Sequence, residues 1–114
     1  MRETAITDKI LAWLNTQQGC WAYKTHGDPY GRRGTPDILC CYKGLFYAFE
    51  VKTPARKDDA TVHQKRAIAK IRAAYGTAEI VTDVTDVQSL LGMAGCCALD
   101  PSSMDETRCV YIPS

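Results

Sequence analysis

The sequence predicts an α/β fold, a mixed β-sheet flanked by helices, with core elements in the order αβββαβ. Three observations support this fold class. Residues 34–52 form two apolar strand-like runs joined at Lys43-Gly44. Helical patterns of apolar residues lie on both sides of them, at 4–18 and 61–76, and a further strand-like run follows at 78–82. A chain of 114 residues has room for one such core, so we expect a single domain over residues 1–114.

The first element is an amphipathic helix from Thr4 to Gln18, closed by Gly19. Its apolar residues fall on one stripe at helical spacing: Ile6, Ile10, Trp13 and Leu14. Glu3 precedes Ile6 by three residues and belongs to that stripe if the helix includes it, which would turn its carboxylate inward. Alternatively, Glu3 is a first-turn acid favoured by the helix dipole.

A first strand is expected at Cys20–His26, followed by a loop at 27–34 that is rich in Gly and Pro. The loop carries Tyr30, Arg32 and Arg33 just before Asp37. Arginines next to glycines can approach phosphates closely, so this loop is a candidate clamp for a nucleic-acid backbone. His26 is either a ligand or base, or simply a hydrogen-bonded histidine at a strand end.

The hairpin that follows predicts a cluster of charged groups. With Lys43 and Gly44 as a two-residue loop, Tyr42 lies opposite Leu45 and Asp37 lies opposite Glu50. Directly opposed side chains have Cβ atoms about 4.5–5.5 Å apart, and two carboxylates that close repel unless a proton or cation lies between them. Side chains alternate along a strand, so Lys52 shares the face of Glu50. A slip of one residue would move Glu50 to the opposite face.

The second helix is expected to begin at a Thr61 cap and to end at Gly76, with Ile68, Ile71 and Tyr75 on its buried stripe. Gln64 shares that inward face, where Glu50 and Lys52 would supply its hydrogen-bond partners. A strand at 78–82 follows, then a short helix through Leu91 that either Asp83 or Thr85 caps. A further edge strand is expected at residues 109–112.

The charge distribution points to a polyanionic partner. From Lys24 to Arg72 there are eleven Lys and Arg against five acids, whereas from Ala73 onward only Arg108 opposes six acids. The six cysteines lack the C-x₂-C spacing of a zinc site, which favours small buried thiols. No run is long enough to span a bilayer, and the Met1-Arg2-Glu3-Thr4 start lacks a signal-peptide pattern, so we expect a cytoplasmic protein.

Together these residues resemble a known family. Pro36-Asp37, Glu50-Val51-Lys52 and the downstream Gln64 resemble the motif of the PD-(D/E)XK nuclease superfamily. The Gly-x-Pro-Asp sequence and the short hairpin are similar, more narrowly, to the virus-type replication-repair nuclease (VRR-NUC) family. The resemblance covers about residues 3–82. It implies a restriction-endonuclease-like core. Members of the family that stand alone, as this chain would, are small proteins from viruses and bacteria.

The resemblance also implies roles for individual residues. Asp37, Glu50 and the carbonyl of Val51 would hold Mg²⁺ or Mn²⁺. Lys52 would orient or deprotonate the attacking water, Gln64 would position Lys52 or the water, and Glu3 matches a first-helix acid. The candidate DNA contacts are the loop residues and basic side chains Lys24, Tyr30, Arg32, Arg33, Arg56, Lys57 and Lys65.

The implied activity is metal-dependent, structure-specific cleavage of DNA, most similar to that of Holliday-junction resolvases, which act as homodimers. A flap, nick or general duplex endonuclease of the same fold is an alternative. A nucleic-acid-binding module without catalysis is another, although such a module gains nothing from clustered buried acids. A structural or metal-storing domain is a third, although the basic central block would have no purpose in it.

Overall fold

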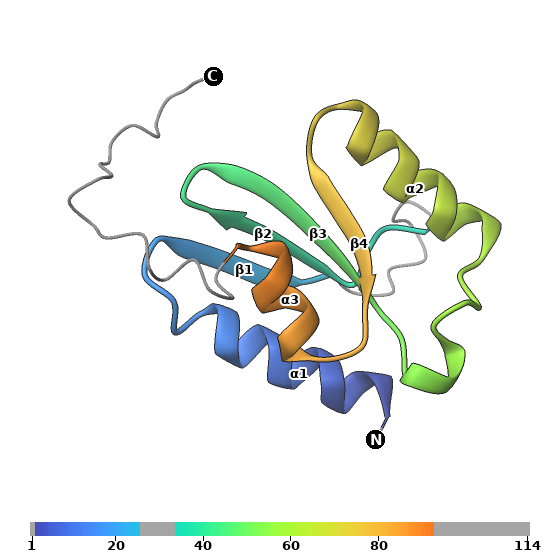
Figure 1. The fold of residues 1–114 in the computed structure, drawn as a ribbon, viewed down its shortest axis with the longest axis horizontal. Coiled ribbons are helices and arrows are strands. Elements are labelled where there is room, and N and C mark those ends of the chain that lie inside the picture. The colour runs from blue at the N-terminus through green and yellow to red at the C-terminus, as the bar shows by residue number, and fades with distance from the viewer. Residues whose placement is uncertain (1, 26–33, 93–114) are drawn as a thin grey trace.

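The computed structural model describes residues 2–25 and 34–92. Within these ranges the elements follow the predicted order, with one added 3₁₀ turn (Figure 1). They are α1 (Glu3–Leu14), β1 (Cys20–Lys24), β2 (Ile38–Tyr42), β3 (Leu45–Val51), η1 (Pro54–Arg56), α2 (Val62–Ala73), β4 (Thr77–Val81) and α3 (Val84–Leu90). The predicted fold class is confirmed.

The four strands form one mixed sheet in the order β1-β2-β3-β4. β1, β2 and β3 are antiparallel neighbours, and β4 runs parallel to β3 after the α2 crossover. Helices α1 and α3 lie together on one side of the sheet and α2 lies on the other (Figure 1). No helix in the described ranges is long and apolar enough to span a membrane.

Each face of the sheet has its own apolar cluster, because side chains alternate along a strand. The larger cluster packs Ile10 and Leu14 of α1 against Phe49 and Val51 of β3. The smaller cluster lies under α2 and joins Ala48, Ile68 and Ala78, with Leu39, Ile71 and Ile80 against it. Residues 48 and 50 of β3 therefore face α2, and residues 49 and 51 face α1 and α3.

Helix α1 is shorter than predicted, since it ends at Leu14 rather than at Gln18. The Asn15 side chain explains the early stop. Its Nδ2 donates to the carbonyl of Ala22 at 3.1 Å, and its Oδ1 accepts from the amide of the same residue at 3.2 Å. A side chain that binds both backbone groups of a residue on β1 ties the end of the helix to the edge strand.

The hairpin register is confirmed. Tyr42 pairs with Leu45, and the ladder continues to Ile38 opposite Phe49, which leaves Asp37 as the next residue along, beside Glu50. Lys43 and Gly44 both have positive φ, 51° and 84°, as a two-residue type I′ turn requires. The lysine accepts this conformation even though glycine or asparagine is the usual choice.

Helix α2 begins where the sequence predicts, at the Thr61 cap, but it ends at Ala73 instead of Gly76. Tyr75 adopts a left-handed φ of 71° beyond the helix, and its side chain is almost fully exposed. The assignment of Tyr75 to the buried stripe was therefore wrong, because the helical spacing no longer holds once the helix has stopped. Ile68 is buried as predicted.

The remaining boundaries shift by small amounts. Strand β4 starts one residue early, and α3 is capped by Asp83, whose Oδ1 accepts from the amide of Asp86 at 3.1 Å. The first strand stops at Lys24. His26 and the strand expected at 109–112 lie outside the described residues.

At Gly34 the chain that leads into β2 lies against the first turn of helix α2. Its φ is +79°, and a Cβ at this position would overlap the carbonyl group of His63 and lie 2.8 Å from the amide nitrogen of Gln64. Only a residue without a side chain lets the chain lie against the first turn of the helix. The chain entering Asp37 and the start of α2 are thereby held together.

We expect Gly34→Ala to destabilise the protein by about 2 kcal/mol or more, because it combines a strained φ with a backbone clash. Urea unfolding monitored by circular dichroism measures this. Gly44→Ala is the matched control, since Gly44 has φ +84° but no atom within 4 Å of an added Cβ. Equal losses in the two variants would show that the contact with α2 contributes nothing.

Candidate functional site

The hairpin places two acids and a lysine at one end of the sheet, on the face that α2 covers. Glu50 and Lys52 come from the end of β3 and are almost fully buried, with 3% and 7% of their surfaces exposed. Asp37 is half-buried and lies just before β2. The strand alternation and the register thus bring together the three side chains that the sequence singled out.

The Asp37 carboxylate is fixed by the backbone of β3. Its Oδ2 accepts a hydrogen bond from the amide of Val51 at 2.9 Å. In an extended strand the N–H and C=O of one residue point to the same edge, so the Val51 carbonyl is directed toward the side on which Asp37 lies. The next amide, that of Lys52, points the other way and donates to the carbonyl of Val81 at 3.0 Å.

Gln64 joins the site to the start of α2. Its Nε2 donates to Glu50 Oε2 at 2.9 Å, and its Oε1 accepts from the backbone amide of Thr61 at 2.9 Å. The second bond belongs to a capping box, in which Thr61 Oγ1 accepts from the amide of Gln64 at 3.1 Å. Because the cap holds the amide oxygen, the amide nitrogen is oriented toward Glu50.

The capping box is the feature of the site that our sequence analysis missed. Thr61 was expected as a simple cap, and Gln64 as an inward-facing polar residue. The spacing Thr61-x-x-Gln64 is itself the signature of a capping box and is readable in the sequence. It would have predicted that only the nitrogen of this amide is available to the acids.

The electrostatics of the site are dominated by Glu50. Burial raises its pKa from the ordinary 4.5 to about 8, helped by the negative charge of Asp37 and a hydrogen bond with it. The charge of Lys52 acts in the opposite direction and does not offset the rise. In addition, Oε1 of Glu50 is buried with no hydrogen-bond partner. A buried acceptor without a partner destabilises the folded protein, so a proton or a cation bound at this carboxylate would stabilise it.

These groups fit a small divalent cation. Two carboxylates and a backbone carbonyl are hard oxygen donors, the kind that Mg²⁺ and Mn²⁺ prefer. In the described part of the chain no cluster of three or more His, Cys, Asp or Glu side chains could hold a metal. Mg²⁺ commonly binds through only one or two carboxylates, completing its shell with water and substrate phosphate.

Glu3 is the first residue of α1, so its position agrees with both interpretations of this acid, as part of the apolar stripe and as a first-turn acid. It is partly exposed. Its negative charge still reaches the site, where it makes a small contribution to the raised pKa of Glu50. A direct or water-mediated role at the metal stays a prediction.

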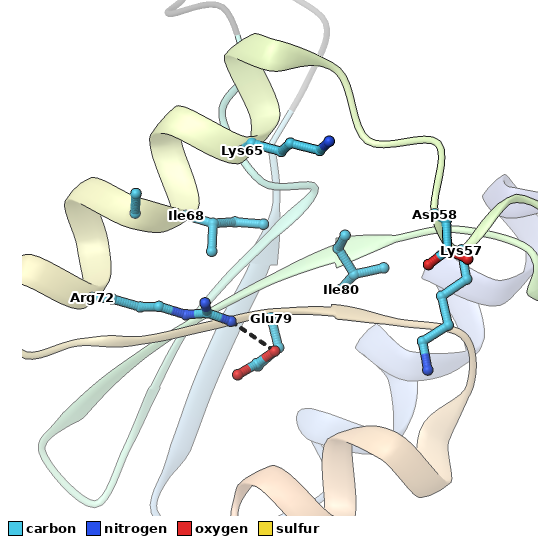
Figure 2. A pocket seen from close by; sticks show the side chains of 8 residues that line it. Lys57, Asp58, Lys65, Ile68, Arg72, Glu79 and Ile80 are labelled. Carbon is cyan, nitrogen blue, oxygen red and sulfur yellow. Dashed lines mark ion pairs between the residues drawn. The ribbon is translucent and has the colours of Figure 1, made fainter.

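The structure distributes the predicted DNA contacts over several places. Lys57 and Lys65 line a hollow of about 400 Å³ between α2 and β4, where Arg72 pairs with Glu79 at 2.8 Å (Figure 2). Arg56 pairs with Asp59 at 3.2 Å. None of the four residues Asp37, Glu50, Lys52 and Gln64 lines this hollow.

The other predicted contacts lie elsewhere. Lys24 shares the sheet face of Ala22, which packs toward α1, and it pairs with Asp8 of α1 at 3.4 Å. The structure therefore does not bring Lys24 to the face that carries Glu50. Tyr30, Arg32, Arg33 and His26 lie outside the described residues, and their proposed contacts stay predictions.

Comparison with solved structures identifies the fold. One protein described as a "VRR_NUC domain" superposes with a TM-score of 0.64 and 22% identity, covering 81% of this chain and 96% of its own. Another, a "VRR_NUC domain protein", gives a TM-score of 0.63 and 16% identity, covering 81% of this chain and 86% of its own. The fold is that of VRR_NUC domains. No protein-family model and no curated protein matches the sequence.

The metal-free site makes a prediction about stability. Above pH 4.5 the unfolded Glu50 is ionised, whereas the folded one keeps its proton up to about pH 8. The free energy of unfolding therefore falls as the pH rises through this window. Glu50→Gln removes the titration and keeps the shape, so we expect it to stabilise the chelator-treated protein at pH 8 by about 1 kcal/mol or more, or about 4 °C in Tm.

Thermal unfolding at pH 5 and pH 8 checks this, with the gain larger at pH 8. Addition of Mn²⁺ should then reverse the order, raising the Tm of the wild type and leaving Glu50→Gln nearly unchanged. A variant that is destabilised at pH 8 without metal would contradict the view that Glu50 is strained there.

Proposed function

We propose that this protein is a metal-dependent endonuclease that hydrolyses phosphodiester bonds in branched DNA. The observation that carries the proposal is the buried, unpartnered Oε1 of Glu50 beside Asp37, with Lys52 and Gln64 around it. A protein that only binds nucleic acid would gain nothing from this destabilising pair. The fold shared with VRR_NUC domains and the basic central block support the same conclusion.

The residues suit this chemistry in complementary ways. Asp37, Glu50 and the Val51 carbonyl would hold Mg²⁺ or Mn²⁺, which when bound lowers the pKa of a water and offsets charge on the scissile phosphate. The Val51 amide keeps Asp37 in place, and Gln64 keeps Glu50 in place. Both acids are thus positioned before substrate arrives, which is what electrostatic preorganisation requires.

Lys52 supplies the positive charge of the site. Its side chain is buried close enough to Glu50 to act on its pKa. We propose that its ammonium group orients the attacking water and offsets the negative charge that develops on the phosphoryl oxygens. No covalent nucleophile on the protein is then required.

Among branched substrates we propose the four-way junction first, with flap DNA as the alternative. A junction resolvase must cut two strands at symmetric positions, so this proposal includes a homodimer that presents two sites. A flap or nick endonuclease needs one site. Cutting of labelled four-way junction, flap and linear duplex, together with sedimentation of the protein, separates these substrates.

We expect Lys52→Ala and the better isostere Lys52→Met to reduce Mn²⁺-dependent cleavage at least about 100-fold, while DNA affinity stays within about threefold. Gel analysis of end-labelled DNA and fluorescence anisotropy measure the two quantities. Lys9→Ala is the matched control, because Lys9 is an exposed lysine of α1 outside the site.

Equal loss of cleavage and affinity would make Lys52 a phosphate anchor instead of a catalytic residue. Tight binding by the wild type without any metal-dependent cutting would reject the nuclease proposal in favour of a binding module. Thermal unfolding of each variant shows whether it is folded under the assay conditions.

A further inference from the structure

An aromatic surface lies on the same face of the sheet as the candidate site. Trp21 and Tyr23 of β1 are exposed, at 63% and 45%, and Phe46 of β3 is 45% exposed. Helix α2 packs over β3 and β4, as the cluster of Ala48, Ile68 and Ala78 shows. Large exposed rings gathered in one place usually mark a binding surface.

The strand alternation assigns these rings to the face of the acids. Ala22 points into the core beneath α1, so Trp21 and Tyr23 on either side of it point to the opposite face. Tyr23 pairs with Leu39, which lies two residues beyond Asp37 and so has the same orientation.

The rings are also close to the acids. Tyr23 is separated from Asp37 by two residues along the strands and by one strand spacing, roughly 7 Å and 5 Å. Trp21 lies two residues from Tyr23 along β1. It pairs with Cys41 of β2, which in turn pairs with Phe46 of β3. A ligand that lies across the rings therefore runs directly toward the acids.

The two rings of β1 form a pair. The centroids of Trp21 and Tyr23 are 5.2 Å apart, with an angle of 49° between their planes. Both residues are amphipathic, with flat apolar faces and a polar edge. Nucleic-acid bases stack on surfaces of this kind with little dependence on sequence, because every base has a π-face.

The charges beside the rings favour a polyanion over a second copy of the chain. Neither β1 nor α2 contains an acid, and α2 carries the four cations Lys65, Arg66, Lys70 and Arg72. Lys65 and Arg72 line the hollow on the β4 side of α2. Ala74 lies beside Phe46, and Lys70 is four residues before it, so Lys70 lies on the side of α2 that is nearer to the rings. A symmetric dimer through this face would oppose like charges.

We propose that Trp21 and Tyr23 form a stacking platform for unpaired DNA bases next to the bond that the site cleaves. The inference rests on the proposed nuclease function for the nature of its partner. It narrows the substrate class to branched DNA with a single-stranded stretch at the branch, such as a flap or an opened junction. Continuous duplex keeps its bases stacked inside the helix and offers none to the platform.

The test compares two labelled DNAs of equal length, a duplex with a single-stranded oligothymidine flap and a blunt duplex, bound in chelator so that neither is cut. We expect Trp21→Ala to weaken flap binding about tenfold or more and to leave blunt-duplex binding within about twofold. Tyr23→Ala should act in the same direction, and Trp21→Phe should keep most of the affinity. Leu45→Ala is the control, because Leu45 is an exposed apolar residue on the opposite face of the sheet.

Two outcomes overturn the platform. Unchanged flap affinity in Trp21→Ala and Tyr23→Ala does so, and so does an equal loss on flap and blunt duplex. Sedimentation that shows a dimer in the wild type and a monomer in Trp21→Ala, with unchanged flap affinity, assigns this face to a second copy.

Cleavage measured in parallel with Mn²⁺ keeps the two proposals separate. Flap binding that depends on Trp21 without any cutting by the wild type supports the platform and rejects the nuclease function. Cutting that depends on Lys52, with flap binding indifferent to Trp21, supports the nuclease function and rejects the platform.

Discussion

The two-residue turn at Lys43 and Gly44 fixes which residue of β2 lies opposite which residue of β3, and the candidate site depends on that register. With it, Asp37 reaches the amide of Val51 and lies beside Glu50. A shift of one residue would turn Glu50 toward the apolar cluster under α1, where a carboxylate has no partner. The turn lies at the far end of the hairpin from the acids, so a local backbone conformation determines the arrangement of two carboxylates that are each six residues away from it.

Apolar packing and a buried charge oppose each other at this hairpin. The core residues Phe49 and Val51 are fully buried and anchor β3, yet the residue between them is an acid whose pKa is raised to about 8 by burial and by Asp37. Neighbouring apolar packing holds in place a group that would otherwise prefer water. Such an arrangement is typical of sites that wait for a cation, because the binding free energy of the ion then compensates for the strain.

Much of this arrangement could be predicted from the sequence, because it follows from short-range rules. The alternation of side chains and the length of the turn predicted that Asp37 lies opposite Glu50. The helical spacing predicted that Gln64 faces inward. The ends of the helices could not be predicted in the same way. Asn15 stops α1 by binding Ala22, which is distant in space until β1 is in place. Tyr75 leaves the α2 stripe because the helix ends first. Contacts between elements decide both cases, and a pattern within one element does not contain them.

The two-ended bonding of Gln64 restricts which residues this position can accept. Glutamate serves as well as glutamine in a capping box, since only a side-chain oxygen is needed at the helix start. Here the other end of the side chain must donate to Glu50, which a carboxylate without a proton cannot do. The requirement of the helix alone would allow exchange between the two residues, whereas the requirement of the acids selects the amide. Glutamine at position 64, an ordinary residue for helix initiation, therefore indicates that a carboxylate lies beside the start of the helix.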